Sequence, residues 1–86
     1  MRAHLTPTER RLWDTLRGKP GRPFTRAELV ALVMPGSIVE ARTIDVHVRA
    51  LRRKLGRDAR QLCTIRQVGY LFAPVDPGSV PVEEPR

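Results

Sequence analysis

The stretch EARTIDVHVRALRRKLG, from Glu40 to Gly56, carries two patterns at once. Aliphatic side chains recur through it every three or four residues, which is the spacing of a buried stripe along an α-helix. The members of this stripe are Ile44, Val48, Leu51 and Leu55. The same stretch holds four arginines and one lysine. It therefore predicts a helix over residues 42–55 with one dry side and one cationic side, ended by the glycine.

A helical projection separates these two sides. At about 100° per residue the aliphatic stripe covers a narrow arc, and the opposite arc is rich in arginine. The opposite arc contains Arg42, Val46, Arg49, Ala50, Arg53 and Arg57, with Thr43 and His47 on one flank and Arg52 on the other. No glutamate lies within residues 42–55 to pair with these arginines along the helix. Neighbouring guanidinium groups repel one another, so this side of the helix indicates an anionic partner.

Length and net charge favour the same kind of partner. The 86 residues, 41 % of them hydrophobic, are enough for one small domain with a single core. The formal net charge is +7, and residues 42–66 account for +6 of it, with eight basic side chains against two acidic ones. Positive charge concentrated in one segment is typical of proteins that bind nucleic acid.

Catalytic and metal-binding chemistry find little support in the sequence. The single cysteine, Cys63, cannot form an internal disulfide and has no histidines clustered near it, so neither a metal site nor a cofactor is expected. His47 and Cys63 do not have the spacing of a nucleophile and base motif, and Cys63 is expected to be a small buried residue. No enzymatic activity is predicted. Because no signal peptide or membrane-spanning run is found, a cytoplasmic location is expected.

Two shorter helices are predicted upstream of the arginine-rich stretch. The first follows Thr6, which together with Glu9 has the spacing of a capping box, and Trp13 lies on its apolar side as an expected core residue. The second follows Thr25, with Glu28 three residues later in the same pattern. Each helix thus has a defined start before the longer third helix begins.

The end of the chain divides into a predicted hairpin and a predicted tail. LCTIRQVGYLF, residues 62–72, contains two runs of β-forming residues around a glycine, which indicates a β-hairpin. Four prolines follow within residues 74–86, so this segment is expected to be a disordered tail. The predicted domain covers residues 1–73 and has an α+β fold of three helices and a C-terminal hairpin.

In this order, LTPTERRLW, FTRAEL, RTIDVHVRALRRKL and TIRQVGYLF resemble the OmpR/PhoB family of winged helix-turn-helix DNA-binding domains. These domains are the output halves of bacterial response regulators. The resemblance covers about Leu5 to Phe72, and four motifs in the right order make it specific. It implies a regulator of transcription that binds double-stranded DNA in a sequence-specific way. The recognition helix, residues 42–55, would enter the major groove, and the wing, residues 62–72, would lie at the minor groove.

The resemblance also implies roles for individual residues. Positions near bases are Thr43, Val46 and Ala50, and positions near phosphates are Arg42, His47 and Arg49, with Arg52 and Arg53 as further contacts. Arg66 matches the wing arginine that enters the minor groove, and Tyr70 matches a residue placed beside the DNA backbone. Loop 35–41 stands where activators of this family touch RNA polymerase.

The sequence departs from the family's pattern in three respects. Ala50 stands where relatives often carry a base-reading arginine, which puts the preferred base there in question. Gln67 replaces a glycine that is common at the tip of the wing. The receiver domain and most of the N-terminal sheet of the family are absent, so an excised fragment or a naturally small protein is expected.

An interaction module is the alternative function. Such a winged helix would bind RNA polymerase or another regulator and contact DNA weakly or not at all. The cores of protein interfaces are depleted in charged residues, so the cationic helix favours DNA. Without a receiver domain, the chain is expected to be a monomer in solution and to pair with a second copy only on DNA, through residues 35–41 and the exposed flank of the hairpin.

Overall fold

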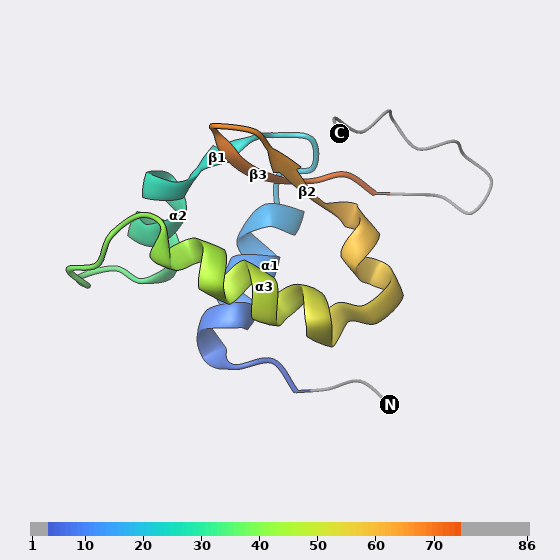
Figure 1. Cartoon of the computed structure of the whole chain (residues 1–86), viewed down its shortest axis with the longest axis horizontal. Coiled ribbons are helices and arrows are strands. Elements are labelled where there is room, and N and C mark those ends of the chain that lie inside the picture. The colour runs from blue at the N-terminus through green and yellow to red at the C-terminus, as the bar shows by residue number, and fades with distance from the viewer. Residues whose placement is uncertain (1–3, 75–86) are drawn as a thin grey trace.

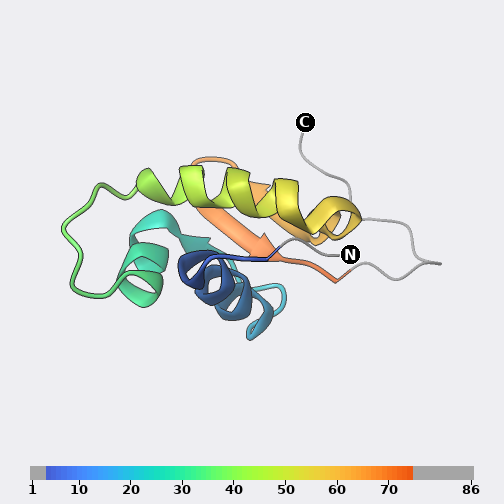
Figure 2. The same ribbon diagram turned by 90° about the horizontal axis from the view of Figure 1, so that it is seen from below.

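The computed structural model describes residues 4–74, and the predicted tail lies almost wholly outside this range. Three α-helices, one 3₁₀ helix and three short strands follow one another along the chain (Figure 1). They are α1 (Pro7–Arg17), β1 (Phe24–Thr25), α2 (Arg26–Val33), α3 (Thr43–Leu55), η1 (Gly56–Gln61), β2 (Leu62–Ile65) and β3 (Gly69–Phe72). In Figure 2, α3 and the hairpin of β2 and β3 lie on one side of the molecule, and α1 and α2 lie on the other.

Both predicted capping boxes are present. At the start of α1 the amide of Glu9 donates to the hydroxyl of Thr6 over 3.1 Å, and the amide of Thr6 donates to the Glu9 carboxylate over 2.9 Å. Thr25 and Glu28 repeat this exchange at the start of α2, over 3.0 and 2.9 Å. Each box satisfies two of the backbone groups that a helix start leaves unpaired, and losing a cap of this kind typically costs about 1 kcal/mol.

The hairpin was predicted correctly, but the third strand was missed. β2 and β3 pair antiparallel with Leu62 opposite Phe72, and β1 pairs with the other edge of β3 with Phe24 opposite Tyr70. The backbones of β1 and β3 are so close that a Cβ atom at Gly69 would collide with the carbonyl oxygen of Phe24. β1 has only two residues, so no alternation of side chains could reveal it in the sequence.

One core joins the helices to the sheet. Its fully buried side chains come from all three helices, and they are Leu12, Leu16, Leu29, Val33, Ile44, Val48 and Leu51. Trp13, predicted to be in the core, is 7 % exposed and meets the ring of Phe72 edge-on, with the ring centroids 5.4 Å apart. Burying each large aliphatic side chain contributes about 1.5–3 kcal/mol, which holds α3 against α1 and α2.

Two parts of the structure differ from the sequence-based expectation. Residues 56–61, for which the sequence predicted no regular element, form the 3₁₀ helix η1, and Gly56 ends α3 with a φ angle of 59°. Cys63 was expected to be buried, but it is only partly buried, because it lies on a strand at the edge of the three-stranded sheet. In the hairpin turn, Gln67 adopts a φ angle of 65°, which places it in the left-handed region.

Candidate nucleic-acid interface

The outward side of α3 carries arginines and small apolar groups. Ile44, Val48 and Leu51 face the core, as their spacing predicted. On the outward side Val46 is 65 % exposed, and Arg49 and Arg53 are exposed as well. Thr43, His47 and Ala50 lie at the border and are half-buried. This surface combines guanidinium donors with methyl-bearing side chains.

Several cations near α3 already have partners within the protein. The Nζ of Lys54 lies 2.8 Å from the carboxylate of Glu9, which is 4 % exposed in α1. Arg42, just before the helix, pairs with Glu40 over 3.0 Å, but both side chains are strongly exposed, so this pair is weak. Six arginines of this region form no ion pair within residues 4–74. Arg52 is hydrogen-bonded to the wing, and the other five are Arg49, Arg53, Arg57, Arg60 and Arg66.

Arg52 is held by the wing. Its Nη2 donates to the carbonyl oxygen of Leu62 and to the hydroxyl of Thr64, both over 2.8 Å. The sequence placed Arg52 among the further DNA contacts. In the structure its guanidinium binds β2, so the residue links the third turn of α3 to the hairpin.

A carboxylate in the first turn of α3 joins three elements. Oδ1 of Asp45 accepts from Nε of Arg26 in α2 over 2.7 Å and from the hydroxyl of Tyr70 in β3 over 2.6 Å. Burial alone would raise the pKa of Asp45, but the bonds from Tyr70 and Arg26 outweigh it and hold this pKa below its ordinary value. Burial and the Asp45 carboxylate both raise the pKa of the Tyr70 phenol.

Tyr70, which the resemblance placed beside the DNA backbone, is largely buried. Its side chain is 5 % exposed, and its hydroxyl hydrogen is already donated to Asp45. The guanidinium groups of Arg26 and Arg52 lie 5.2 and 5.7 Å from the centroid of its ring. Contacts of this kind attract a cation to the face of the ring. Tyr70 thus contacts Asp45, Arg26 and Arg52 inside the protein, and its place beside the DNA backbone stays a prediction.

A hollow of about 470 Å³ lies between α3 and the sheet, and three arginines contribute to its walls. It is lined by Asp45, Val48, Arg49, Arg52, Arg53 and Tyr70. Since Asp45 is neutralised by Arg26, the arginines determine the charge of this hollow. At the tip of the wing, Arg66 is exposed beside Gln67 and Val68. The exposed arginines thus occupy both α3 and the turn of the hairpin.

The structure brings most of the predicted site residues onto one element. All but two of the ten belong to α3 or its N-cap, the exceptions being Arg66 in the turn and Tyr70 in β3. Sequence reasoning missed Arg26 and Thr64, which hold Asp45 and Arg52 in place. Their partners lie 19 and 12 positions away in the chain, and no local pattern signals a pairing over that separation.

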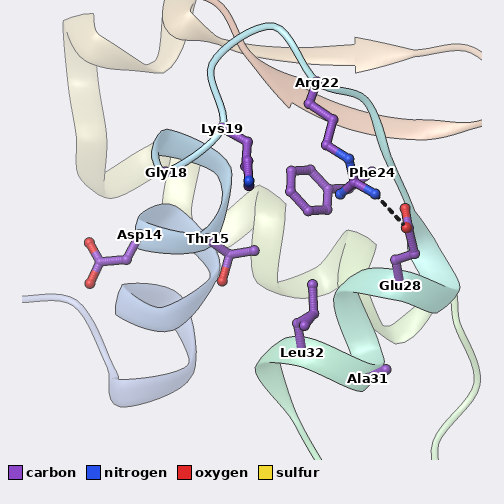
Figure 3. A pocket seen from close by; sticks show the side chains of 9 residues that line it. All are labelled: Asp14, Thr15, Gly18, Lys19, Arg22, Phe24, Glu28, Ala31 and Leu32. Carbon is purple, nitrogen blue, oxygen red and sulfur yellow. Dashed lines mark hydrogen bonds and ion pairs between the residues drawn. The ribbon is translucent and has the colours of Figure 1, made fainter.

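A second hollow, of about 740 Å³, lies between α1, α2 and the connection that joins α1 to β1 (Figure 3). The guanidinium of Arg22 covers the ring of Phe24 at 4.2 Å and is tied to Glu28 over 2.9 Å, while Leu32 borders the hollow from α2. It shares no residue with the hollow beside Tyr70. Within residues 4–74 no group of three or more acidic, histidine or cysteine side chains could hold a metal ion, and no helix is long and apolar enough to span a membrane.

The family model described as "Transcriptional regulatory protein, C terminal" matches residues 1–72. The chain belongs to this family. The family consists of DNA-binding regulators of transcription and is not a class of enzymes, which agrees with the winged helix and its arginine-bearing helix. The resemblance to OmpR/PhoB effector domains is thereby confirmed, and so is the predicted fold class.

Two curated relatives from bacteria are regulators of transcription. The phosphate regulon transcriptional regulatory protein PhoB of Pseudomonas aeruginosa is 41 % identical over 73 residues, which is 83 % of this chain and 32 % of the relative. The transcriptional regulatory protein BaeR of Escherichia coli is 44 % identical over 70 residues, covering 77 % of this chain and 29 % of the relative. The chain thus spans about a third of the length of these relatives.

Solved structures in the same family share the fold. The DNA-binding domain of the response regulator AdeR, in complex with an intercistronic region, superimposes with a TM-score of 0.74 at 36 % identity. The match covers 83 % of this chain and 74 % of that domain. The likeness extends over most of residues 4–74, including the three helices and the hairpin.

Proposed function

We propose that this chain is the sequence-specific DNA-binding unit of a bacterial transcription regulator and acts in the cytoplasm. In this proposal α3 enters the major groove of double-stranded DNA, and the hairpin of β2 and β3 lies at the adjacent minor groove. The observation that carries it is the outward side of α3, where Arg49 and Arg53 are exposed without a counter-ion in residues 4–74.

The chemistry of α3 suits a major groove. A groove about 12 Å wide admits one helix, arginines donate to guanine or to phosphates, and small apolar side chains contact the methyl group of thymine. Val46 and Ala50 supply the apolar contacts, and Thr43 and His47 lie beside them with hydrogen-bonding groups. The AdeR domain was solved with DNA, which supports the same mode of binding here.

Selection of bound sequences from a random duplex pool tests this function directly. An enriched sequence that competes against unrelated DNA is the expected result. If the pool shows no enrichment, and binding is equally weak for every duplex, sequence-specific recognition is ruled out for this chain.

Arg49→Ala tests the contact to the backbone. Loss of one phosphate contact should weaken binding to all sequences and reduce the slope of log affinity against log salt by about one unit. Arg10→Ala is the matched control, because Arg10 is exposed on α1 and its loss removes the same charge from a different helix. A salt titration of both variants is sufficient. Equal slopes in the two would remove Arg49 from the interface.

Arg66 is proposed to enter the minor groove, because it is exposed in the turn at the tip of the wing. A narrow A·T-rich groove has an enhanced negative potential that attracts a guanidinium. Arg66→Ala should therefore reduce the preference for A·T-rich flanks while leaving the sequence bound by α3 unchanged. Competition between duplexes that differ only in their flanks measures this. The idea fails if wild type and variant prefer the flanks equally.

A second partner is proposed for the loop between α2 and α3. Residues 35–41 carry Ile38, which is 99 % exposed, and Val39, which is 42 % exposed. Apolar side chains in such a position favour a protein contact, here with RNA polymerase. Ile38→Ser should lower transcription from a dependent promoter without changing DNA affinity. Unchanged transcription at equal occupancy would remove Ile38 from such a contact.

The chain is further proposed to be a monomer that pairs only on DNA. One winged helix buries roughly 600–1,000 Å² on DNA, so a single copy binds modestly, and a neighbouring site raises its effective concentration. Light scattering measures the oligomeric state of the free protein. Titration of duplexes with one and two sites then measures whether a neighbouring site raises the affinity. A stable dimer in the absence of DNA would contradict the proposal.

A further inference from the structure

Arg52 occupies the side of α3 that faces the hairpin, and one nitrogen of its guanidinium, Nη2, donates inside the protein. The two hydrogens of Nη2 have two acceptors, the carbonyl oxygen of Leu62 and the hydroxyl of Thr64, each at 2.8 Å. The same guanidinium lies 5.7 Å from the centroid of the Tyr70 ring in β3. A planar, rigid donor group of this kind fixes both the distance and the angle of what it holds.

The hairpin is attached to α3 at two separate points. Near the start of the helix, Asp45 accepts from the Tyr70 hydroxyl in β3. Seven residues later, Arg52 donates to β2. At a rise of 1.5 Å per residue, these attachments lie roughly 10 Å apart along the helix axis. A single attachment would act as a pivot, whereas two of them prevent the hairpin from rotating relative to the helix.

We infer that Arg52 is a positioning residue that fixes the wing relative to α3, and so selects the spacing, in base pairs, between the sequence bound in the major groove and the flank bound by Arg66. The inference rests on the proposed function. A wing held rigidly places Arg66 over one base step, whereas a loosened wing reaches several steps with similar affinity.

This role differs from a phosphate contact in what it predicts for salt. Arg52 donates to neutral acceptors in the protein, so these bonds do not contribute to the release of counterions when DNA binds. Removing them should leave the salt slope of binding unchanged. A positioning residue should alter the preferred spacing and leave the salt slope unchanged. A phosphate-binding residue should do the reverse, as expected for Arg49.

The experiment uses duplexes in which an A·T-rich flank is moved away from the selected site in steps of one base pair. Wild type should prefer one spacing. Arg52→Lys keeps the charge but cannot donate to two acceptors from a planar group, and Thr64→Val removes one acceptor while retaining a β-branched side chain. Both variants should reduce the preference for the best spacing by roughly five- to tenfold, the effect of about one hydrogen bond. Thr15→Val, on α1, is the control for a lost hydroxyl and should retain the wild-type preference.

The outcomes separate the possible roles of Arg52. A sharp spacing preference in both variants would overturn the inference. Because lysine keeps the charge, the salt slope is measured on Arg52→Ala, and a fall of about one unit in that variant would assign the residue to phosphate binding. Should wild type fail to bind DNA at all, the proposed function fails, and the free protein still tests the positioning role. Amide hydrogen exchange in β2 should be faster in both variants than in wild type, and unchanged exchange would overturn the role of Arg52 there as well.

Discussion

Gln67 is the non-glycine residue with a positive φ angle within residues 4–74, at 65° in the turn of the hairpin. In this region the Cβ atom of an ordinary side chain lies too close to the backbone, at a cost of about 1–2 kcal/mol. The structure holds Gln67 in a conformation that glycine would adopt without strain. The hairpin turn thus forms even though Gln67 adds backbone strain there.

Substitutions at Gln67 should follow backbone strain. Gln67→Gly removes the strained Cβ atom but adds unfolded-state entropy, so stability should be unchanged or rise by up to about 1 kcal/mol. Gln67→Val places a β-branched residue at a positive φ angle and should destabilise the domain by about 1–2 kcal/mol. Thermal unfolding of each variant gives the order. Val68→Gly is the control, because residue 68 has a negative φ angle and glycine should only destabilise it. A lower melting temperature for Gln67→Gly than for Gln67→Val would refute this explanation.

At the scale of elements, Glu9 and Lys54 hold the start of α1 against the end of α3. The carboxylate of Glu9 is nearly buried, and it accepts both from Lys54 and from the amide of Thr6. Burial on its own would raise the pKa of Glu9, but these bonds outweigh it and lower the pKa from 4.5. One side chain therefore caps a helix and fixes the far end of the recognition helix.

The pH dependence of stability should reflect this lowered pKa. Since Glu9 binds its proton less readily in the folded state, its contribution is present above about pH 4.5 and is lost as the pH falls through the lower folded value. Glu9→Gln should cost about 1–3 kcal/mol at neutral pH and make the loss of stability in acid shallower. Denaturant unfolding between pH 7 and pH 3 measures both effects. Asp14→Asn is the control. Asp14 and its partner Arg17 are both about half exposed, so losing this pair should change stability little. An equally steep acid response in Glu9→Gln would refute this role.

Local patterns predicted the elements that depend on local physics. The two capping boxes, the stripe of α3 and the β-rich runs of the hairpin each lie within a few neighbouring residues, and each was predicted correctly. What was missed depends on contacts across the chain: the pairing of β1 with β3, the network of Asp45, and the bond from Arg52 to the wing. Periodicity was sufficient to predict which positions on the outward side of α3 are cationic. It could not predict which of these cations are available to DNA, because that depends on partners elsewhere in the chain.

For the whole molecule, this distinction changes the number of charges that can meet DNA. Residues 42–66 contain eight basic side chains, but Lys54 is paired with Glu9 and Arg52 is bound to the wing. Arg42 has a weak surface partner in Glu40. Five exposed arginines remain without an ion pair in the described residues.

The salt dependence of binding should match these five arginines and fall short of the full count of cations. With about 0.9 units per neutralised phosphate, the slope of log affinity against log salt should be no steeper than about −4.5 for a single site. Eight phosphate contacts would give roughly −7. Titration of one duplex site at several salt concentrations distinguishes the two values. A slope steeper than about −6 would mean that Lys54 and Arg52 leave their partners when DNA binds.

The edge-on contact between Trp13 and Phe72 has a practical consequence for all of these experiments. Trp13 is the sole tryptophan of the sequence, and the ring contacts described for it, to Phe72 and Arg17, involve no residue proposed to touch DNA. Its fluorescence should shift to longer wavelength when water enters the core on unfolding, and it should stay nearly constant while duplex DNA is added. Tryptophan fluorescence can thus distinguish a variant that is unfolded from a folded variant that no longer binds DNA.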